Sequence, residues 1–592
     1  MNSRHTPRLT FREMFTPKLI ATLHEGYRFK DFQADAVAGL TVAIVALPLS
    51  MAIAIASGLS PDRGLYTAII GGFLISALGG SRFQIGGPAG AFIVLIFAIV
   101  ERHGYDGLVL ATMMAGVMML VAGFLRWGTY IKYIPYPVTV GFTTGIAVII
   151  FASQIKELLG LDIAKEPAAL VPKLSALWAQ IATIHPTTVL LSILAIIIIL
   201  GVRRLRPNWP GMLIAVAVTA ALTGFMHLDV ATIGTRFGAV PQTLPAPTLP
   251  AFDLQKMRGL LPDAFAIALL GAIESLLSAV VADGMSGRRH RSNCELVAQG
   301  AANIAAVIFG GMPVTGTIAR TATNVRSGAR GPVSGILHAL YVLLFMLVAA
   351  PLASYIPLAS LGAVLAIVAW NMAEKEEFVA LLRSSQGDAL VLLATFLLTI
   401  FEDLTMGIGV GVTLGAFLFL HRMAESVEVQ GGQPFLDEDQ ADDYGGMREA
   451  YNAVNAVDPD FMVYKISGAF FFGATAAVGT ALDRIGKYPR AFALDFSEVP
   501  LIDSTAAKAL EAFVQKLHRR NTQVYIVGAR PSVRRTLLIA GLRKPAVQYR
   551  RTATDARERP IARQALPDQL AGVSSHCVTN AATDIRFRRG RA

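Results

Sequence analysis

Long apolar runs recur along most of the chain, from Val37 to His421. A helix needs about 20 mostly apolar residues to cross a bilayer. Dividing the runs at charged residues and at Gly/Pro breaks gives fourteen candidate spans, near 36–57, 64–79, 86–100, 107–125, 134–155, 186–202, 210–227, 259–282, 295–310, 315–328, 331–350, 357–372, 388–401 and 405–421. Only 16% of the 592 residues are charged, against about 25% in soluble domains. The sequence therefore predicts a polytopic α-helical membrane protein whose main partner is the lipid bilayer.

Basic residues predict the orientation of these spans, because cytoplasmic loops carry an excess of Lys and Arg. If the N-terminal segment 1–35 is cytoplasmic, every connection on that side contains Lys or Arg. The short connections on the other side, near 311–314, 351–356 and 402–404, contain none. Segment 1–35 has no early apolar core, so we do not expect a signal peptide. We expect an inner-membrane protein with both termini cytoplasmic, whose formal charge of +11 serves orientation and not nucleic-acid binding.

Fourteen spans divide into two halves of seven, and an odd number inverts the second half relative to the first. The third span follows the glycine-rich run from Gly79 to Gly90, and the tenth follows the run from Gly310 to Thr317. Short, Gly/Pro-interrupted segments in corresponding halves are typical of the midplane binding site of secondary transporters. The alternative is that Gly and Pro are simply common in membrane helices. We favour a binding site because the interruptions are matched.

Two charged residues stand out within the candidate spans. Glu274 lies in the middle of the eighth span, and Ser278 follows it by one helical turn. A carboxylate at the centre of a bilayer helix costs about 3 kcal/mol, so Glu274 must face a polar cavity or a partner. It is a candidate for carrying a coupling proton or cation; the alternative is a hydrogen bond to neighbouring helix ends.

Arg320 is the second such charge and lies within two turns of the start of the tenth span. Free backbone N–H groups and the positive end of the helix dipole attract anions at such a position. An arginine there favours an anion as substrate. The alternative is that Arg320 is a structural partner that neutralises Glu274, and both roles are compatible.

The composition changes after the transmembrane domain, 36–421. Residues 422–460 are polar and acidic, typical of a linker, whereas 461–550 alternate short apolar strands with amphipathic helices. Strands are predicted at 461–466, 491–496 and 524–527, and helices at 475–486, 504–519 and 531–540. This alternation predicts a small α/β domain with a mixed or parallel sheet. The basic tail, 551–592, is expected to be disordered.

The sequence gives few signs of catalysis. Cys294 and Cys577 are far apart and have no neighbouring Cys/His cluster, so neither a disulfide nor a zinc site is predicted. Nucleotide-binding and hydrolase motifs are missing from the sequence. We expect no enzyme and no cofactor. Asp503 and Ser504 lie at a strand–helix junction where helix capping is the simpler interpretation; Ser504 as a regulatory phosphorylation site is the alternative.

Several stretches resemble the SulP (sulfate permease) anion transporters with a C-terminal STAS domain. They are the segments from Ser57 to Tyr66, Gly79 to Pro88, Glu274 to Ala279, Gly310 to Gly328 and, in the C-terminal domain, Gly468 to Gly473. The resemblance covers about residues 30–550. It implies a 7+7 inverted repeat with core and gate domains, an elevator-type movement, a homodimer and a cytoplasmic partner of the STAS domain.

The resemblance also implies a site. An anion would be held between the helix N-termini at Pro88, Ala89 and Gly90 and at Gly316, Thr317 and Ala319. Arg320 would support the anion, and Glu274 would couple transport to H⁺ or Na⁺. Many eukaryotic members have Gln and an aromatic residue where this chain has Leu49 and Ile53.

The resemblance leaves the substrate open. The segments 315–328 and 369–372 are most similar to the bacterial C4-dicarboxylate branch. We therefore expect proton-driven uptake of sulfate or of a C4-dicarboxylate such as succinate, fumarate or aspartate. The alternatives are a sodium-dependent bicarbonate transporter that uses Glu274 and Ser278 for Na⁺, a STAS-based regulator on a non-transporting scaffold, and a nucleobase–cation symporter.

Overall fold

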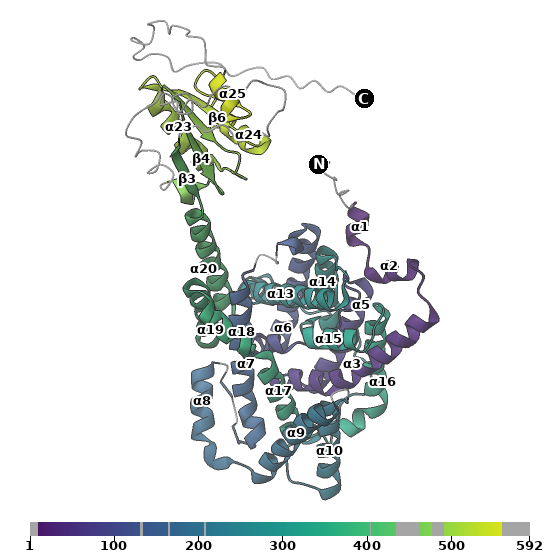
Figure 1. The fold of residues 1–592 in the computed structure, drawn as a ribbon. Helices are drawn as coiled ribbons and strands as arrows, with labels where there is room; N and C mark the ends of the chain where they lie inside the picture. Colours follow the sequence, from purple (N-terminus) through teal and green to yellow (C-terminus); the bar gives the residue numbers. More distant parts are fainter. Residues whose placement is uncertain are drawn as a thin grey trace. The chain divides into compact units, whose positions relative to one another are not determined.

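The computed structural model describes residues 10–130, 134–163, 166–167, 169–206, 209–402, 404–433, 461–475 and 490–558. The chain divides into two compact units, Met1–Leu418 and Phe419–Ala592. The first unit is built from helices, and the second contains a five-stranded sheet (Figure 1). A helical membrane protein with a C-terminal α/β domain is the predicted fold class, and it is confirmed.

The helical unit contains a helix at each candidate span. The longer ones are α3 (Phe29–Ala56), α6 (Ile93–Phe124), α7 (Tyr136–Leu159), α9 (Pro186–Leu205), α10 (Gly211–Met226), α13 (Leu261–Ser286), α14 (Ser292–Ile308), α15 (Ile318–Arg326), α16 (Val333–Ala353), α17 (Leu358–Met372), α19 (Gln386–Phe401) and α20 (Leu404–Glu425). Within the described residues, eight helices are long and apolar enough to cross a membrane by themselves. The count of fourteen spans stays a prediction.

Three parts of this unit differ from a simple series of spans. The second span is interrupted: α4 (Pro61–Tyr66) and α5 (Gly72–Leu78) flank a π-helical turn, Thr67–Gly71. The third and fourth spans are joined in α6, but Gly104 leaves the helical conformation between them, with φ of 68°. The short helices α8 (Leu170–Ala179) and α18 (Lys375–Ser384) lie between predicted spans. Neither is long enough to give a spanning signal.

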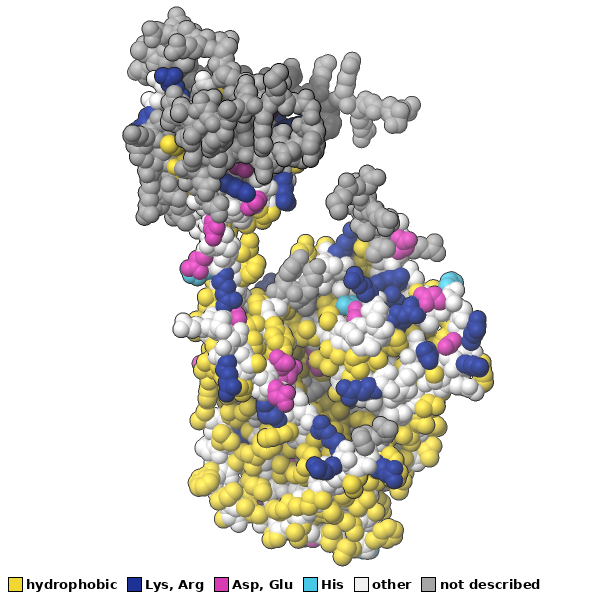
Figure 2. All heavy atoms as spheres, in the orientation of Figure 1, with side chains coloured by type: hydrophobic (Ala, Val, Ile, Leu, Met, Phe, Trp, Pro, Cys, Tyr) yellow, Lys and Arg dark blue, Asp and Glu magenta, His cyan; other side chains and the backbone are white. Residues whose placement is uncertain are grey.

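Large apolar side chains cover much of the visible outer surface of the helical unit (Figure 2). Phe225 is 85% exposed and Leu205 is 79% exposed. Soluble monomers rarely expose contiguous apolar patches of such extent. The surface is therefore suited to lipid chains and not to water.

The second unit is a mixed sheet in the order β3-β4-β5-β6-β7. The strands are β3 (Glu428–Gln433), β4 (Phe461–Ser467), β5 (Ala491–Asp495), β6 (Gln523–Val527) and β7 (Gln548–Arg550). The last four are parallel, and β3 pairs antiparallel with β4 at one edge. Among the described residues, the helices that follow α20 in this unit are α23 (Ser504–His518), α24 (Pro531–Ile539) and α25 (Ala553–Glu558). Helix α25 lies in the segment 551–592, so the prediction of disorder is wrong for these residues.

The predicted strands β4, β5 and β6 and the predicted helices α23 and α24 are confirmed. The predicted helix 475–486 lies almost wholly outside the described residues. Strand β3 lies in the segment 422–460, which was expected to be a linker. Its sequence, Glu-Val-Gln-Gly-Gly-Gln, contains a single apolar residue. The pattern did not reveal this strand, because an edge strand needs little apolar surface to pair.

Candidate substrate-binding cavity

Two short strands bring the matched helix interruptions together. Strand β1 (Gly86–Gly87) pairs antiparallel with β2 (Thr315–Gly316), so that Gly86 lies opposite Gly316. A short 3-10 turn, Gly90–Phe92, leads from β1 into α6, and α15 begins two residues after β2. The first N–H groups of a helix have no partner within the helix and carry the positive end of its dipole. Two such helix starts therefore lie beside one another.

Close packing at this crossing depends on glycine. A Cβ atom at Gly316 would lie 1.6 Å from Nε2 of Gln84, and one at Gly87 would lie 2.1 Å from Nη1 of Arg320. Gln84 donates a hydrogen bond from Nε2 to Oγ of Ser275 at 2.7 Å. The glycines thus leave room for two polar side chains that would otherwise be displaced.

A cavity of about 400 Å³, here called the central cavity, lies at these helix starts. Most of its wall is apolar and is contributed by α3, α7, α13 and α17. The predicted residues that line it are Pro88, Ala89, Gly90, Glu274, Thr317, Ala319 and Arg320. Leu49 and Ile53 also line it. The structure therefore gathers seven of the predicted residues around one space.

Gly316 and Ser278, by contrast, do not line the central cavity. Gly316 is buried in β2. Ser278 is fully buried, and its hydroxyl donates a hydrogen bond to Oγ1 of Thr321 at 3.1 Å. The Thr321 hydroxyl in turn accepts from the backbone N–H of Ile85 at 3.0 Å. Ser278 thus joins α13 to α15 outside the lining of the cavity.

Arg320 is 2% exposed and keeps most of its donors free. Its Nη2 donates to Oγ of Ser50 at 3.2 Å and to the carbonyl oxygen of Pro88 at 3.3 Å. Its Nε and Nη1 have no hydrogen-bond partner among the described residues. A buried cation without a direct ion-pair partner costs roughly several kcal/mol, so this arrangement favours the entry of an anion.

Glu274 lines the same cavity, but it does not neutralise Arg320 directly. Among the described residues, no ion pair within 4.0 Å joins the two side chains. Oε2 of Glu274 is buried and has no hydrogen-bond partner in that part of the chain. The geometry therefore does not support a direct structural pair, and both charges face the cavity.

Some residues around the site carry no clear signal in the sequence. Ser50 is an ordinary small residue of α3 until the fold places it against Arg320. Glu295, in the first turn of α14, is fully buried and accepts from the N–H groups of Gly80 and Ser81 at 2.9 and 3.1 Å. Gln299, one turn later, donates to its other oxygen at 3.0 Å. The available signal in the sequence was a glutamate followed four residues later by a glutamine, but the same pattern also fits an ordinary helix start.

In the α/β unit, Asp503 caps α23. Its Oδ1 accepts from the N–H of Ala506 at 2.8 Å, and its Oδ2 accepts from the N–H of Phe472 at 3.1 Å. Ser504 is the exposed first residue of that helix. Capping therefore involves Asp503, and phosphorylation of Ser504 stays a prediction.

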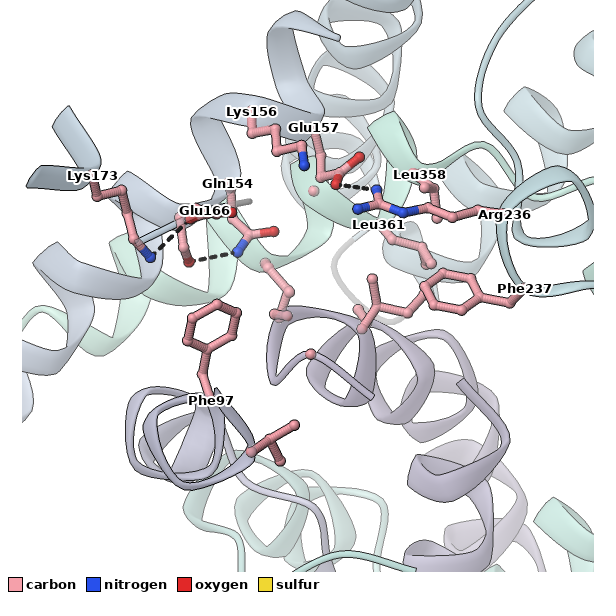
Figure 3. Close-up of a pocket in the computed structure, with 18 of the residues that line it drawn as sticks. Phe97, Gln154, Lys156, Glu157, Glu166, Lys173, Arg236, Phe237, Leu358 and Leu361 are labelled. Atoms are coloured by element: carbon pink, nitrogen blue, oxygen red, sulfur yellow. Dashed lines mark hydrogen bonds and ion pairs between the residues drawn. The ribbon is translucent and has the colours of Figure 1, made fainter. Parts of the chain in front are cut away.

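A second space of about 320 Å³, here called the charged cavity, lies at the other ends of several of the same helices (Figure 3). Lys173 forms an ion pair with Glu166 at 2.8 Å, and Arg236 forms one with Glu157 at 2.6 Å. Nζ of Lys156 donates to the carbonyl oxygen of Ile163 at 2.7 Å. Its cations are thus satisfied within the chain.

Interrupted helices that meet at a cavity inside an apolar helical unit are typical of secondary transporters. Residues 32–395 match the Sulfate permease family, and residues 452–553 match the STAS domain. The chain belongs to the sulfate permease family. It is an anion transporter with a C-terminal STAS domain and not an enzyme.

Individual relatives support this assignment. The chain is 40% identical over 522 residues to the putative sulfate transporter YvdB of Bacillus subtilis, covering 88% of this chain and 95% of that protein. It is 31% identical over 529 residues to the bicarbonate transporter BicA of Synechocystis, covering 86% and 90%. The structure of the murine Slc26a9 anion transporter in the inward-facing state matches with a TM-score of 0.79 at 17% identity, covering 94% of this chain and 96% of that one. This last likeness concerns the fold alone.

Proposed function

We propose that this protein is a secondary-active transporter that takes up a divalent anion, sulfate or a C4-dicarboxylate, by proton symport. The observation that carries the proposal is the buried Arg320, whose Nε and Nη1 have no partner among the described residues. It lies where the starts of α6 and α15 converge. Arginine and helix N-termini are the groups that bind oxyanions with fixed geometry. An anion in this apolar-walled space exchanges its hydration shell for these fixed dipoles.

Glu274 would supply the coupling proton. Its carboxylate lines the same cavity as Arg320, so an ionised Glu274 repels an incoming anion and competes for the field of the guanidinium. Protonation removes that repulsion, and by thermodynamic linkage a bound anion then favours the protonated acid to the same extent. The anion and the proton are therefore expected to bind together.

The arrangement of the helices supports an elevator-type movement. The starts of α6 and α15, together with α3 and α13, surround the charged groups, whereas α7 and α17 contribute only uncharged residues to the lining. Movement of the first set along the second would carry the anion with its site. We place the protein in the inner membrane, as a homodimer, with both termini cytoplasmic, in line with the distribution of Lys and Arg.

Sodium-driven bicarbonate transport is the second candidate, since BicA of Synechocystis is 31% identical over 529 residues. In that case Na⁺ would need oxygen ligands near Glu274. The Ser278 hydroxyl is already donated to Thr321 and does not line the central cavity. This contact disfavours the sodium alternative.

The test is uptake by proteoliposomes of labelled sulfate, succinate and bicarbonate, each with an imposed proton gradient, an imposed sodium gradient or none. We expect sulfate or succinate to accumulate with an inward proton gradient and to be indifferent to sodium. Accumulation of bicarbonate with sodium alone would replace the proposal by the second candidate. Failure of all three substrates to enter, together with loss of anion binding on deletion of residues 426–592, would favour a STAS-based regulator on a scaffold.

A further inference from the structure

Helix α24 of the STAS domain has one face in the core and one face that nothing in the described chain covers. Val533 and Leu537 point into the domain and are 1% and 0% exposed. Residues four apart share a helix face, so Arg534 lies one turn before Leu538 and Arg535 one turn before Ile539. The outward face of α24 therefore carries cationic and apolar side chains together.

This face is strongly basic. Arg530, Arg534, Arg535, Arg543 and Lys544 are all exposed, and the sequence contains no Asp or Glu between Glu511 and Asp555. Among the described residues, none of these five cations forms an ion pair. We call this set, together with Ile539, the α24 basic surface.

Neutral groups hold two of the guanidinium groups in place. Nε of Arg543 donates to the carbonyl oxygen of Leu538 at 2.8 Å. The guanidinium carbon of Arg534 lies 4.9 Å from the ring centre of Tyr549. Burial raises the pKa of Tyr549 to about 12, so this ring stays neutral and does not cancel the charge above it.

An open groove of about 670 Å³ lies between Pro531, Arg534, Arg535, Ile539 and Arg543. Its rim carries guanidinium groups, and Ile539, which is 71% exposed, contributes an apolar side. A phosphate group with an attached apolar chain matches both features. Basic amphipathic helices with exposed aliphatic residues bind to the interface of anionic membranes for this reason.

We propose that the α24 basic surface binds the headgroups of anionic phospholipids at the bilayer in which the chain's own helices lie. The connection supports this partner: α20 ends at Glu425 and β3 begins at Glu428, so two residues join a candidate membrane span to the sheet. Such a short tether holds the domain at a high effective concentration of lipid. The inference rests on the proposed function in one respect, which is that the STAS domain lies on the cytoplasmic side of the membrane. The cytoplasmic leaflet is rich in anionic lipid.

The test is hydrogen exchange of the full-length protein in nanodiscs of phosphatidylcholine with and without phosphatidylglycerol. Nanodiscs expose both leaflets, so the result does not depend on orientation or on transport activity. We expect the amides of residues 533–543 to exchange at least about threefold more slowly with phosphatidylglycerol, and the protection to weaken with salt.

Three variants make the test specific. Replacing Arg534, Arg535 and Arg543 by Gln should abolish the lipid-dependent protection, and replacing them by Lys should keep most of it, since a lipid surface responds to charge. The matched control neutralises Lys508, Arg519 and Arg520, exposed cations outside the α24 basic surface, and should keep the protection. Equal loss in this control would show that net charge alone acts and would overturn the proposal.

Two other outcomes would also overturn it. Equal exchange in the two lipids shows that the surface does not bind anionic headgroups. If a soluble polyglutamate peptide then protects 533–543, the surface belongs to an acidic protein partner. Uptake by proteoliposomes of the same two lipid compositions separates this proposal from the proposed function, because transport by the Gln variant with unchanged anion affinity leaves the transport assignment intact.

Discussion

The central cavity and the charged cavity use the same helices and treat charge in opposite ways. Helices α3, α7 and α17 line both. In the charged cavity, Lys173 and Arg236 each have a carboxylate partner, so the chain itself offsets the free-energy cost of desolvating these two cations. In the central cavity, Arg320 has only a hydroxyl and a carbonyl oxygen. On the proposed function, the substrate supplies the direct ion-pair partner that Arg320 lacks among the described residues, whereas Lys173 and Arg236 already have theirs.

The largest effect is expected at Arg320. Replacing Arg320 by Ala removes the guanidinium of the central cavity, whose Nε and Nη1 have no partner among the described residues. Anion affinity should fall at least about a hundredfold, since a charge-assisted bidentate contact is lost. Replacing it by Lys should recover part of the affinity. The measurement is equilibrium binding of labelled sulfate or succinate, with thermal unfolding as the check on folding. Unchanged affinity in the alanine variant would sink the assignment.

The matched control is Arg236→Ala in the charged cavity, which removes a cation whose carboxylate partner is Glu157. The anion affinity of this variant should stay within about threefold of the wild type, because the lost ion pair is internal to the chain and is partly screened by solvent. A similar collapse of affinity in both variants would show that the two cavities do not differ as described.

The next effect concerns coupling. Replacing Glu274 by Gln keeps the shape of the side chain but fixes it in a neutral form. The accumulation of anion driven by a proton gradient should fall at least about tenfold, whereas exchange of anion for anion should continue. The reason is that coupling requires a proton to be bound in one state of the transporter and released in another. The measurement is uptake by proteoliposomes over a range of pH. A pH dependence identical to that of the wild type would refute the coupling role.

A smaller effect is expected at Gly87. A Cβ atom there would lie 2.1 Å from Nη1 of Arg320, so Gly87→Ala must move the guanidinium. We expect anion affinity to fall about tenfold, as a charged donor is displaced without being removed. The control is Gly201→Ala in α9, where a Cβ meets nothing within 4 Å. Equal affinities in the two variants would show that the position of Arg320 is not set by Gly87.

The smallest effect on transport is expected from Glu166. Glu166→Gln leaves Lys173 without its carboxylate, and Lys173 is 4% exposed. Removing one member of a mostly buried pair should lower stability by about 3 kcal/mol, with anion affinity unchanged. The measurement is the Tm alongside anion binding. Adding Lys173→Met should restore much of the stability, and a large loss of affinity in either variant would give the charged cavity a direct role in binding.

Much of the central cavity could be predicted because a bilayer makes certain residues expensive. Glu274 and Arg320 stand out because a charged side chain in a membrane helix carries a free-energy cost and is retained mainly for function. The paired glycine-rich interruptions stand out against the long apolar runs. Gly87 and Ser50 could not be assigned a role in this way. Their contributions depend on contacts between segments distant in sequence, such as the 3.2 Å contact between Arg320 and Ser50.

The α/β unit shows the same limit on a smaller scale. The alternation of apolar and polar residues predicts β4, β5 and β6, because a buried strand must be apolar. Strand β3 has one apolar residue in six and is defined by its hydrogen bonds to β4. An edge strand of this kind has no signal of its own.

The sequence by itself determined a helical membrane protein with a terminal α/β domain, the two interrupted segments and the two costly charges. These follow from local terms, namely the transfer of each residue into lipid and the breaking of helices by Gly and Pro. Only the tertiary structure decided that Arg320 has free donors while Lys173 and Arg236 are paired. Whether a charge is compensated depends on which distant side chain lies within a few ångströms, and no local pattern records that distance.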